Sequence, residues 1–211
     1  MKVNFDKKIS EHAFIFDNVV LGNNVTIMPG AVIGRPPVSS GATTRKNKKD
    51  YGDLIIGDDC VIGANAVIYS GTKIGKGSMV CDTACIREEV EIGDNTLIAM
   101  GVTINTNTNI GSNVKIMDNT HITGNAVIEN NVFIGMLVTM ANDNSMGRGN
   151  DDLKDMLGPT IREGAIIGQA SCLLPGVIIG ENSIVGANSV VTKDVEKDTL
   201  VMGVPAKKVS K

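Results

Sequence analysis

The stretch Ile56–Ile74 reads IGDDCVIGANAVIYSGTKI, with an isoleucine at every sixth position. The same spacing continues to Met140 and Met146, and it recurs in the flanking segments Leu21–Ile33 and Ile161–Val191. Every member of this column is Ile, Leu, Val or Met. A period of six fits neither an α-helix nor a coiled coil, whose periods are about 3.6 and 3.5 residues. The sequence therefore predicts a repetitive all-β structure built from hexapeptides.

Two further positions of the hexapeptide have a constant chemistry. The residue after the aliphatic is often glycine, as in Gly57, Gly75 and Gly93, and we expect it to allow a positive φ where the chain turns a corner. The residue two before the aliphatic is small, as in Cys60 and Ala66, and strand alternation directs it to the same side. Each hexapeptide is thus predicted to form one short strand and one turn. Three of them would make a triangular coil, which gives a prism of about eight coils.

Composition narrows the classes of protein that the chain can represent. The net charge is −3, so no overall basic field indicates a nucleic-acid partner. The first residues, MKVNFDKKIS, do not resemble a signal peptide, and no long apolar run predicts a membrane span. The four cysteines lack the spacing of metal ligands. We expect a cytoplasmic protein with free thiols and no metal.

The column breaks twice within what is predicted to be one domain over residues 1–211. The first insertion, 35–53, contains Arg35, Arg45, Lys46, Lys48 and Lys49 before its first acidic residue, Asp50. It is either a solvated loop or a clamp for a phosphorylated ligand, since Arg and Lys pair well with phosphate oxygens. The second insertion, 142–158, is expected to contain a helical turn over 150–158 and to cover an active site or lie on the surface. A C-terminal extension, 195–211, follows the last repeat.

The repeat [LIV]-G-x-x-x-x and the ending GANSVVTKDVEKDTLVMGVPAKKV, Gly186–Val209, resemble the hexapeptide acyltransferase superfamily. The resemblance implies a left-handed parallel β-helix, a homotrimer with sites between subunits, and acyl-CoA as cosubstrate. It places Gly168 and Ala187 against the pantetheine arm of coenzyme A. It places Thr192, Lys193, Pro205 and Lys208 near the adenine and its phosphates.

Three further stretches are IGRPP at Ile33–Pro37, CDTACIREEVEIG at Cys81–Gly93 and NDNSMGR at Asn142–Arg148. Together they resemble the nucleotide-sugar N-acyltransferases, such as those acting on dTDP-4-amino-4,6-dideoxyglucose in polysaccharide biosynthesis. This implies transfer of an acetyl or longer acyl group, such as hydroxybutyryl, to a sugar amine. The candidate residues for the nucleotide sugar are Arg35, Pro36, Asp82, Arg87 and Glu88.

Four residues are candidates for catalysis. His121 precedes the inward Ile122 and is predicted to point outward from a central coil, where it would act as a base or contact the amine, or only form an interface hydrogen bond. Asn142 and Asp143 open the second insertion, where they would orient the amine or the thioester. Asp94 follows a corner glycine and is either functional or an ordinary turn former.

The main alternative is an O-acetyltransferase of sugars or antibiotics, in which His121 would be an essential base that activates a hydroxyl. A β-helical carbonic anhydrase is disfavoured because it needs three outward histidines and the chain has two in all. A purely structural prism is disfavoured because it would not need the two insertions.

Overall fold

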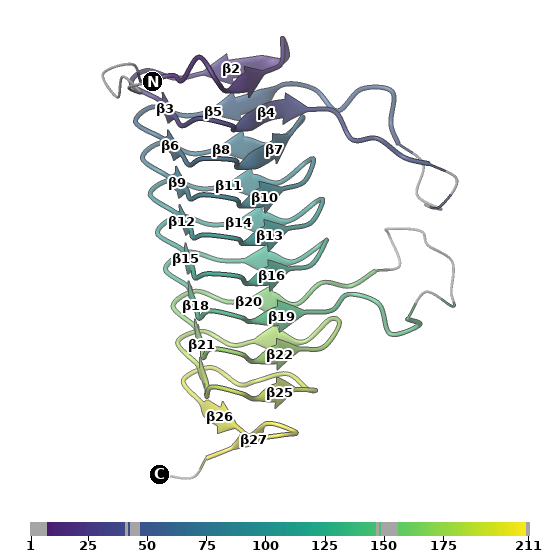
Figure 1. The fold of residues 1–211 in the computed structure, drawn as a ribbon. Helices are drawn as coiled ribbons and strands as arrows, with labels where there is room; N and C mark the ends of the chain where they lie inside the picture. The colour runs from purple at the N-terminus through teal and green to yellow at the C-terminus, as the bar shows by residue number, and fades with distance from the viewer. Residues whose placement is uncertain (1–7, 41, 43–46, 147, 149–155, 210–211) are drawn as a thin grey trace.

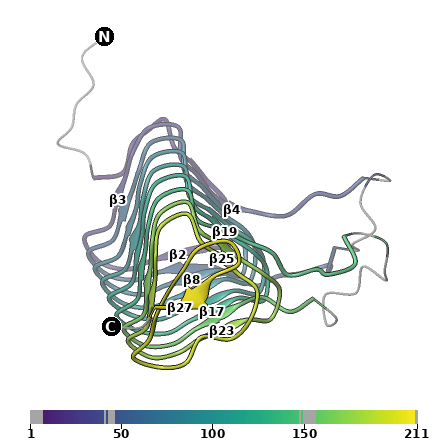
Figure 2. The same cartoon turned by 90° about the horizontal axis from the view of Figure 1, so that it is seen from below.

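The protein is a left-handed parallel β-helix of about ten turns, seen from the side in Figure 1. The computed structural model describes residues 8–40, 42, 47–146, 148 and 156–209. Within these residues all regular structure is β-strand, and there is no helix that could cross a membrane. The cross-section is triangular, as Figure 2 shows, so the prism has three flat faces and three corners.

Each face is one sheet. Face 1 has nine strands: β1 (Phe14–Ile15), β4 (Val32–Arg35), β7 (Val67–Tyr69), β10 (Cys85–Ile86), β13 (Thr103–Ile104), β16 (His121–Ile122), β19 (Thr139–Met140), β22 (Cys172–Leu173) and β25 (Val190–Val191). Face 2 has eight: β2 (Val19–Leu21), β5 (Leu54–Ile56), β8 (Lys73–Ile74), β11 (Glu91–Ile92), β14 (Asn109–Ile110), β17 (Val127–Ile128), β20 (Thr160–Ile161) and β23 (Ile178–Ile179). 

Face 3 has ten strands: β3 (Thr26–Ile27), β6 (Val61–Ile62), β9 (Met79–Val80), β12 (Leu97–Ile98), β15 (Lys115–Ile116), β18 (Phe133–Ile134), β21 (Ile166–Ile167), β24 (Ile184–Val185), β26 (Leu200–Met202) and β27 (Lys207–Lys208). All pairs are parallel except the last, β26 with β27, which closes the C-terminal end as a hairpin. The estimate of about eight coils was too low because short strands before Leu21 and after Val191 extend the prism beyond the hexapeptide column.

One coil takes 18 residues in the uninterrupted part of the chain. Ile86 pairs with Ile104, which belongs to the coil below, and the backbone N–H of Cys85 donates to the carbonyl of Val102 over 2.9 Å. Each coil is therefore joined mainly to its two neighbours. Two residues lie above one another when they are 18 apart in sequence, a rule that decides which side chains can form a site.

The predicted column is the core of the prism. From Ile27 to Val191 its members are buried, with one exception, and Leu21 at the N-terminal end is partly buried. The exception is Met146, which we predicted to be inward and which is 87% exposed. The chain leaves the prism after Met140 at the end of β19, so the sixfold spacing to Met146 is a coincidence of the insertion.

The prediction that the corner glycines have a positive φ holds at Gly34 (φ 84°) but not at Gly57, Gly75 or Gly93. The positive φ falls three residues after the aliphatic, at residues such as Asn95 (φ 52°) and Asn113 (φ 59°). The glycine directly after the aliphatic is needed because adjacent coils approach closely. A Cβ on Gly93 would lie 2.6 Å from the backbone nitrogen of Ser112, and one on Gly75 would lie 2.6 Å from that of Asp94.

Both insertions leave the prism at the corner where the chain passes from face 1 to face 2, here called the 1–2 corner. The first connects β4 to β5, the second connects β19 to β20, and they project on the same side in Figures 1 and 2. Five coil steps separate β4 from β19 on face 1, or roughly 24 Å at about 4.8 Å per step. Most of the expected helical turn over 150–158 lies outside the described residues, and the described part, 156–158, is not helical.

Candidate active site

His121 lies on the outer surface of face 1, as predicted from its place before Ile122. It is on β16, half-buried, between Thr103 on β13 and Thr139 on β19. Its Nδ1 is 2.7 Å from the hydroxyl of Thr103. Burial lowers the pKa of His121 from the ordinary value of 6.5. The ring is therefore neutral at pH 7, so one of its nitrogens can accept a hydrogen bond or a proton.

A cationic cluster lies at the 1–2 corner above His121. The guanidinium groups of Arg35 and Arg87 lie 5.4 and 5.0 Å from the centroid of the Tyr69 ring, within the range of cation–π attraction. Tyr69 ends β7 and Arg87 follows β10, so the two residues are 18 apart and stack in successive coils. The cluster includes two of the residues that we assigned to the nucleotide sugar, Arg35 and Arg87.

Glu88 holds Arg87 in this cluster. The Nε of Arg87 donates to Oε2 of Glu88 over 2.8 Å, and its Nη2 donates to Oε1 over 3.2 Å. The side chain of Glu88 is fully buried, whereas that of Arg87 is 35% exposed. Burial lowers the pKa of Arg87, but the hydrogen bond and charge of Glu88 outweigh burial and raise it overall. The guanidinium is thus permanently charged, fixed in direction and still accessible to a ligand.

The first insertion packs against the same corner. The Lys48 ammonium forms an ion pair with Glu89 and lies 5.9 Å from the centroid of the Tyr51 ring. The backbone N–H of Gly71 donates to the carbonyl of Gly52 over 3.1 Å. Pro36 is exposed beside Arg35. Arg45 and Lys46 lie outside the described residues, so their place relative to the cluster is not described.

Asn142 and Asp143 stand at the start of the second insertion, one coil below His121. The side-chain amide of Asn142 donates to the carbonyl of Gly124 over 3.1 Å. The backbone carbonyl of Asn142 accepts from the N–H of Leu157 over 3.0 Å. Asp143 accepts hydrogen bonds from the N–H and hydroxyl of Ser145, both over 2.6 Å. Both side chains thus form hydrogen bonds at the start of the loop, and their catalytic role stays a prediction.

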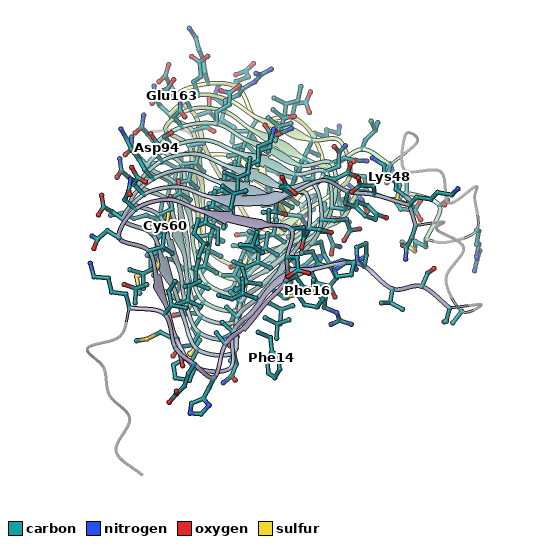
Figure 3. All side chains as sticks on the ribbon, turned by 90° about the horizontal axis from the view of Figure 1, so that it is seen from above. Phe14, Phe16, Lys48, Cys60, Asp94 and Glu163 are labelled. Carbon is teal, nitrogen blue, oxygen red and sulfur yellow. The ribbon has the colours of Figure 1, made fainter. Side chains whose placement is uncertain are left out.

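Asp82 and Asp94 lie at corners other than the one that carries Arg87. Asp82 follows β9 at the corner between faces 3 and 1, and its carboxylate accepts from the N–H of Ala64 over 2.7 Å. Asp94 follows β11 at the corner between faces 2 and 3, where it accepts from the N–H of Lys76 over 3.0 Å. Figure 3 shows Asp94 and Lys48 at different corners of the triangle. Asp82, Arg87 and Glu88 therefore do not form one cluster, although they are close in sequence.

The residues assigned to coenzyme A fall into three groups. Gly168 and Ala187 stack at the corner between faces 3 and 1, where a Cβ on Gly168 would lie 2.5 Å from the nitrogen of Ala187. Thr192 and Lys193 are exposed at the 1–2 corner after β25. Pro205 and Lys208 belong to the C-terminal hairpin, and Lys208 pairs with Glu196 over 2.8 Å. All three groups lie in the last coils. Gly168 and Ala187 are the pair that stacks at one corner in two neighbouring coils.

A surface hollow of about 540 Å³ lies on face 2, away from these groups. It is lined by Lys73, Glu91, Asp94 and Asn109, together with isoleucines and glycines of the same coils. Of the candidates, only Asp94 borders it. His121 and Arg87 do not line this hollow.

Two residues beside the candidates were missed from the sequence, Tyr69 and Thr103. Each stands 18 positions before a residue that was singled out, Arg87 and His121 respectively. That spacing was available in the sequence, because one coil of three hexapeptides has 18 residues. Applied to each candidate in turn, it finds the neighbour in the next coil.

The chain belongs to the bacterial transferase hexapeptide family, whose model matches residues 71–106, 107–142 and 158–193, just over half of the chain. A second model, the hexapeptide repeat of succinyl-transferase, matches residues 53–81. The predicted superfamily is thereby confirmed.

Relatives in this family are named as acyl-transferring enzymes. Serine acetyltransferase of Buchnera aphidicola is 39% identical over 83 residues, which cover 36% of this chain and 30% of that protein. The 2,3,4,5-tetrahydropyridine-2,6-dicarboxylate N-acetyltransferase of Staphylococcus aureus is 37% identical over 75 residues, 34% of this chain and 26% of that protein. The chain thus matches less than a third of the length of these curated relatives.

A solved structure matches over more of the chain. UDP-N-acetylglucosamine acyltransferase from Campylobacter jejuni superposes with a TM-score of 0.76 and 26% identity, covering 96% of this chain and 74% of that one. These names agree with the prediction of an acyl-transferring enzyme.

Proposed function

We propose that the protein is an acyl-CoA-dependent N-acyltransferase that moves an acetyl or longer acyl group, such as hydroxybutyryl, to the amine of a nucleotide-linked aminosugar. The observation that carries the proposal is the placement of two guanidinium groups against Tyr69, one of them anchored by Glu88, on the same side of the prism as the half-buried His121. Arg35 and Arg87 supply two guanidinium groups suited to a diphosphate. His121 lies two coils below Arg87, about 10 Å along the prism axis.

The distance along the axis between Arg87 and His121 suits a sugar diphosphate bound between them. With the diphosphate at Arg35 and Arg87, the sugar would extend down face 1 toward His121. The sugar amine would then attack the thioester carbonyl, the C–S bond of acyl-CoA would break, and the amine proton would pass to His121 or to the leaving thiolate. Alignment of amine and thioester supplies much of the rate in such a transfer. Acyl-CoA would approach from the C-terminal coils that carry Gly168 and Ala187.

We further propose a homotrimer with sites between subunits. The outward column of face 3 includes Met79, Phe133, Ile166 and Ile184, each 38–43% exposed. Lys115 stands in the same column, in register with Phe133. Apolar surface of this extent on one face is typical of an interaction surface. A second subunit would also add side chains beside His121, which is half-buried in the single chain.

A thiol-release assay tests the proposed reaction. Nucleotide-linked aminosugars with the amine on different sugar carbons are offered with acetyl-CoA and with longer acyl-CoAs. We expect thiol release that depends on the amine, with a matched nucleotide sugar carrying a hydroxyl in its place as control. Release with the hydroxyl sugar and none with any amine would contradict the proposal.

The alternative, an O-acetyltransferase, is favoured by one feature of His121, the burial that lowers its pKa and so favours the form that can accept a proton. A hydroxyl needs a base more than an amine does, since an amine beside sugar oxygens is partly unprotonated near pH 7. The same assay separates the two reactions, because only the O-acetyltransferase would release thiol with the hydroxyl sugar.

A further inference from the structure

The ring of His121 is positioned by a single side chain of the coil above it. Thr103 and His121 are register partners on β13 and β16, and the Thr103 hydroxyl is 2.7 Å from Nδ1 of His121. A hydrogen bond at Nδ1 fixes the rotation of the imidazole about its bond to Cβ. It also engages one ring nitrogen, which leaves Nε2 as the nitrogen available to a substrate.

A hydroxyl is suited to this place because it can reverse its role. It donates to Nδ1 when that nitrogen carries no proton, and it accepts from Nδ1–H in the other neutral tautomer and in the imidazolium. The contact therefore persists while Nε2 gains or loses a proton. A carboxylate would stabilise the imidazolium more strongly and would work against the neutral state that burial favours.

We propose that Thr103 is the positioning residue of the acyl-transfer site, holding His121 through Nδ1 so that Nε2 faces the sugar amine. This inference rests on the proposed function for the identity of the substrate. The contact itself does not depend on it and can be measured without any substrate.

The neighbourhood of His121 on face 1 offers a matched control. Thr139 flanks His121 from the coil below, in register with it on β19. Among the described residues, the hydrogen bond of the His121 ring goes to Thr103 and not to Thr139. Outward side chains on the next strands of face 1 are Cys85 and Cys172, and the lowered pKa of His121 is caused by burial.

The experiment compares Thr103→Val, Thr103→Ser and Thr139→Val with the unmodified full chain. Imidazole NMR is practical because the chain has two histidines, and the exposed His12 serves as an internal reference. In Thr103→Val we expect the pKa of His121 to fall, because the imidazolium loses its acceptor, and its Nδ1 resonance to move. Thr103→Ser and Thr139→Val should leave both unchanged.

Kinetics test the positioning role. We expect Thr103→Val to lower kcat about tenfold, the value of one hydrogen bond, and to change KM for either substrate less than about twofold. Thr103→Ser should restore kcat. The inference is overturned if Thr103→Val leaves the NMR signals of His121 unchanged, if kcat is unaffected, or if Thr139→Val has the same effects. Failure of every substrate in the thiol-release assay would refute the proposed function while the NMR result still stood.

Discussion

Arg87 is the single residue on which the proposed nucleotide-sugar site depends most. Its guanidinium donates two hydrogen bonds to the fully buried Glu88 and lies against Tyr69. Lysine keeps the charge but has neither the planar fork nor the stacking surface. We expect Arg87→Lys to raise KM for the nucleotide sugar about tenfold. Lys115→Arg, an exposed cation on face 3, is the control, and an equal rise in KM for acyl-CoA would contradict the assignment.

His121 decides between alignment and base catalysis. Because burial lowers its pKa from 6.5, the ring loses its neutral form only as the pH falls below 6.5. If alignment dominates, as we expect, His121→Ala costs less than about a hundredfold in kcat, and the pH profile shifts with the amine of each substrate tested. Steady-state kinetics from pH 5 to 9 provide the measurement. A loss of about a thousandfold, with a profile that ignores the substrate, would instead support the O-acetyltransferase.

The sequence predicted that His121 points outward and grouped Arg35 with Arg87, and the structure agrees with both placements. It misjudged which residues surround them. Asp82 and Arg87 are five positions apart and lie at different corners, whereas Tyr69 and Arg87 are 18 apart and stack. In a prism of 18-residue coils, two residues a few positions apart lie on different faces or corners of the same coil. Residues 18 positions apart lie above one another. Grouping candidates by closeness in sequence therefore failed, even though the repeat itself was correctly identified.

At most corner glycines, the close approach of adjacent coils replaces a positive φ as the reason for the residue. An ordinary Gly→Ala change at a permissive φ stabilises a protein by about 0.4–1 kcal/mol. A Cβ on Gly93 would lie 2.6 Å from a backbone nitrogen of the next coil, and overpacking of this kind costs about 1–3 kcal/mol. We therefore expect Gly93→Ala to lower the free energy of unfolding, measured by urea denaturation. Stabilisation by this variant would contradict the close approach of adjacent coils as the reason for this glycine.

The strands were predictable from the sequence because every hexapeptide must bury one inward aliphatic residue. A strand of two residues has little intrinsic stability, but each inward isoleucine packs between isoleucines above and below it. The insertions could be located because they interrupt this column. Their internal structure could not, since loop packing depends on individual contacts such as Lys48 with Glu89 that follow no period.

At the scale of the whole molecule, the apolar column of face 3 bears on assembly. We expect the protein to sediment and scatter light as a trimer of the 22.2 kDa chain. Phe133→Lys removes an aromatic ring and places a second charge in that column beside Lys115, and should shift the assembly toward the monomer. Asn109→Lys, on the outer surface of face 2, is the matched control. A wild-type monomer with full activity would exclude sites shared between subunits.

The constant rise per coil has a consequence for which substrates such a protein can accept. The distance between the arginine cluster and His121 is a whole number of steps of about 4.8 Å. Side-chain substitutions can adjust it only slightly, whereas gain or loss of 18 residues changes it by one full step and leaves the isoleucine column continuous. Substrate length in this architecture is therefore a discrete variable, set by how many coils the gene encodes between two fixed points.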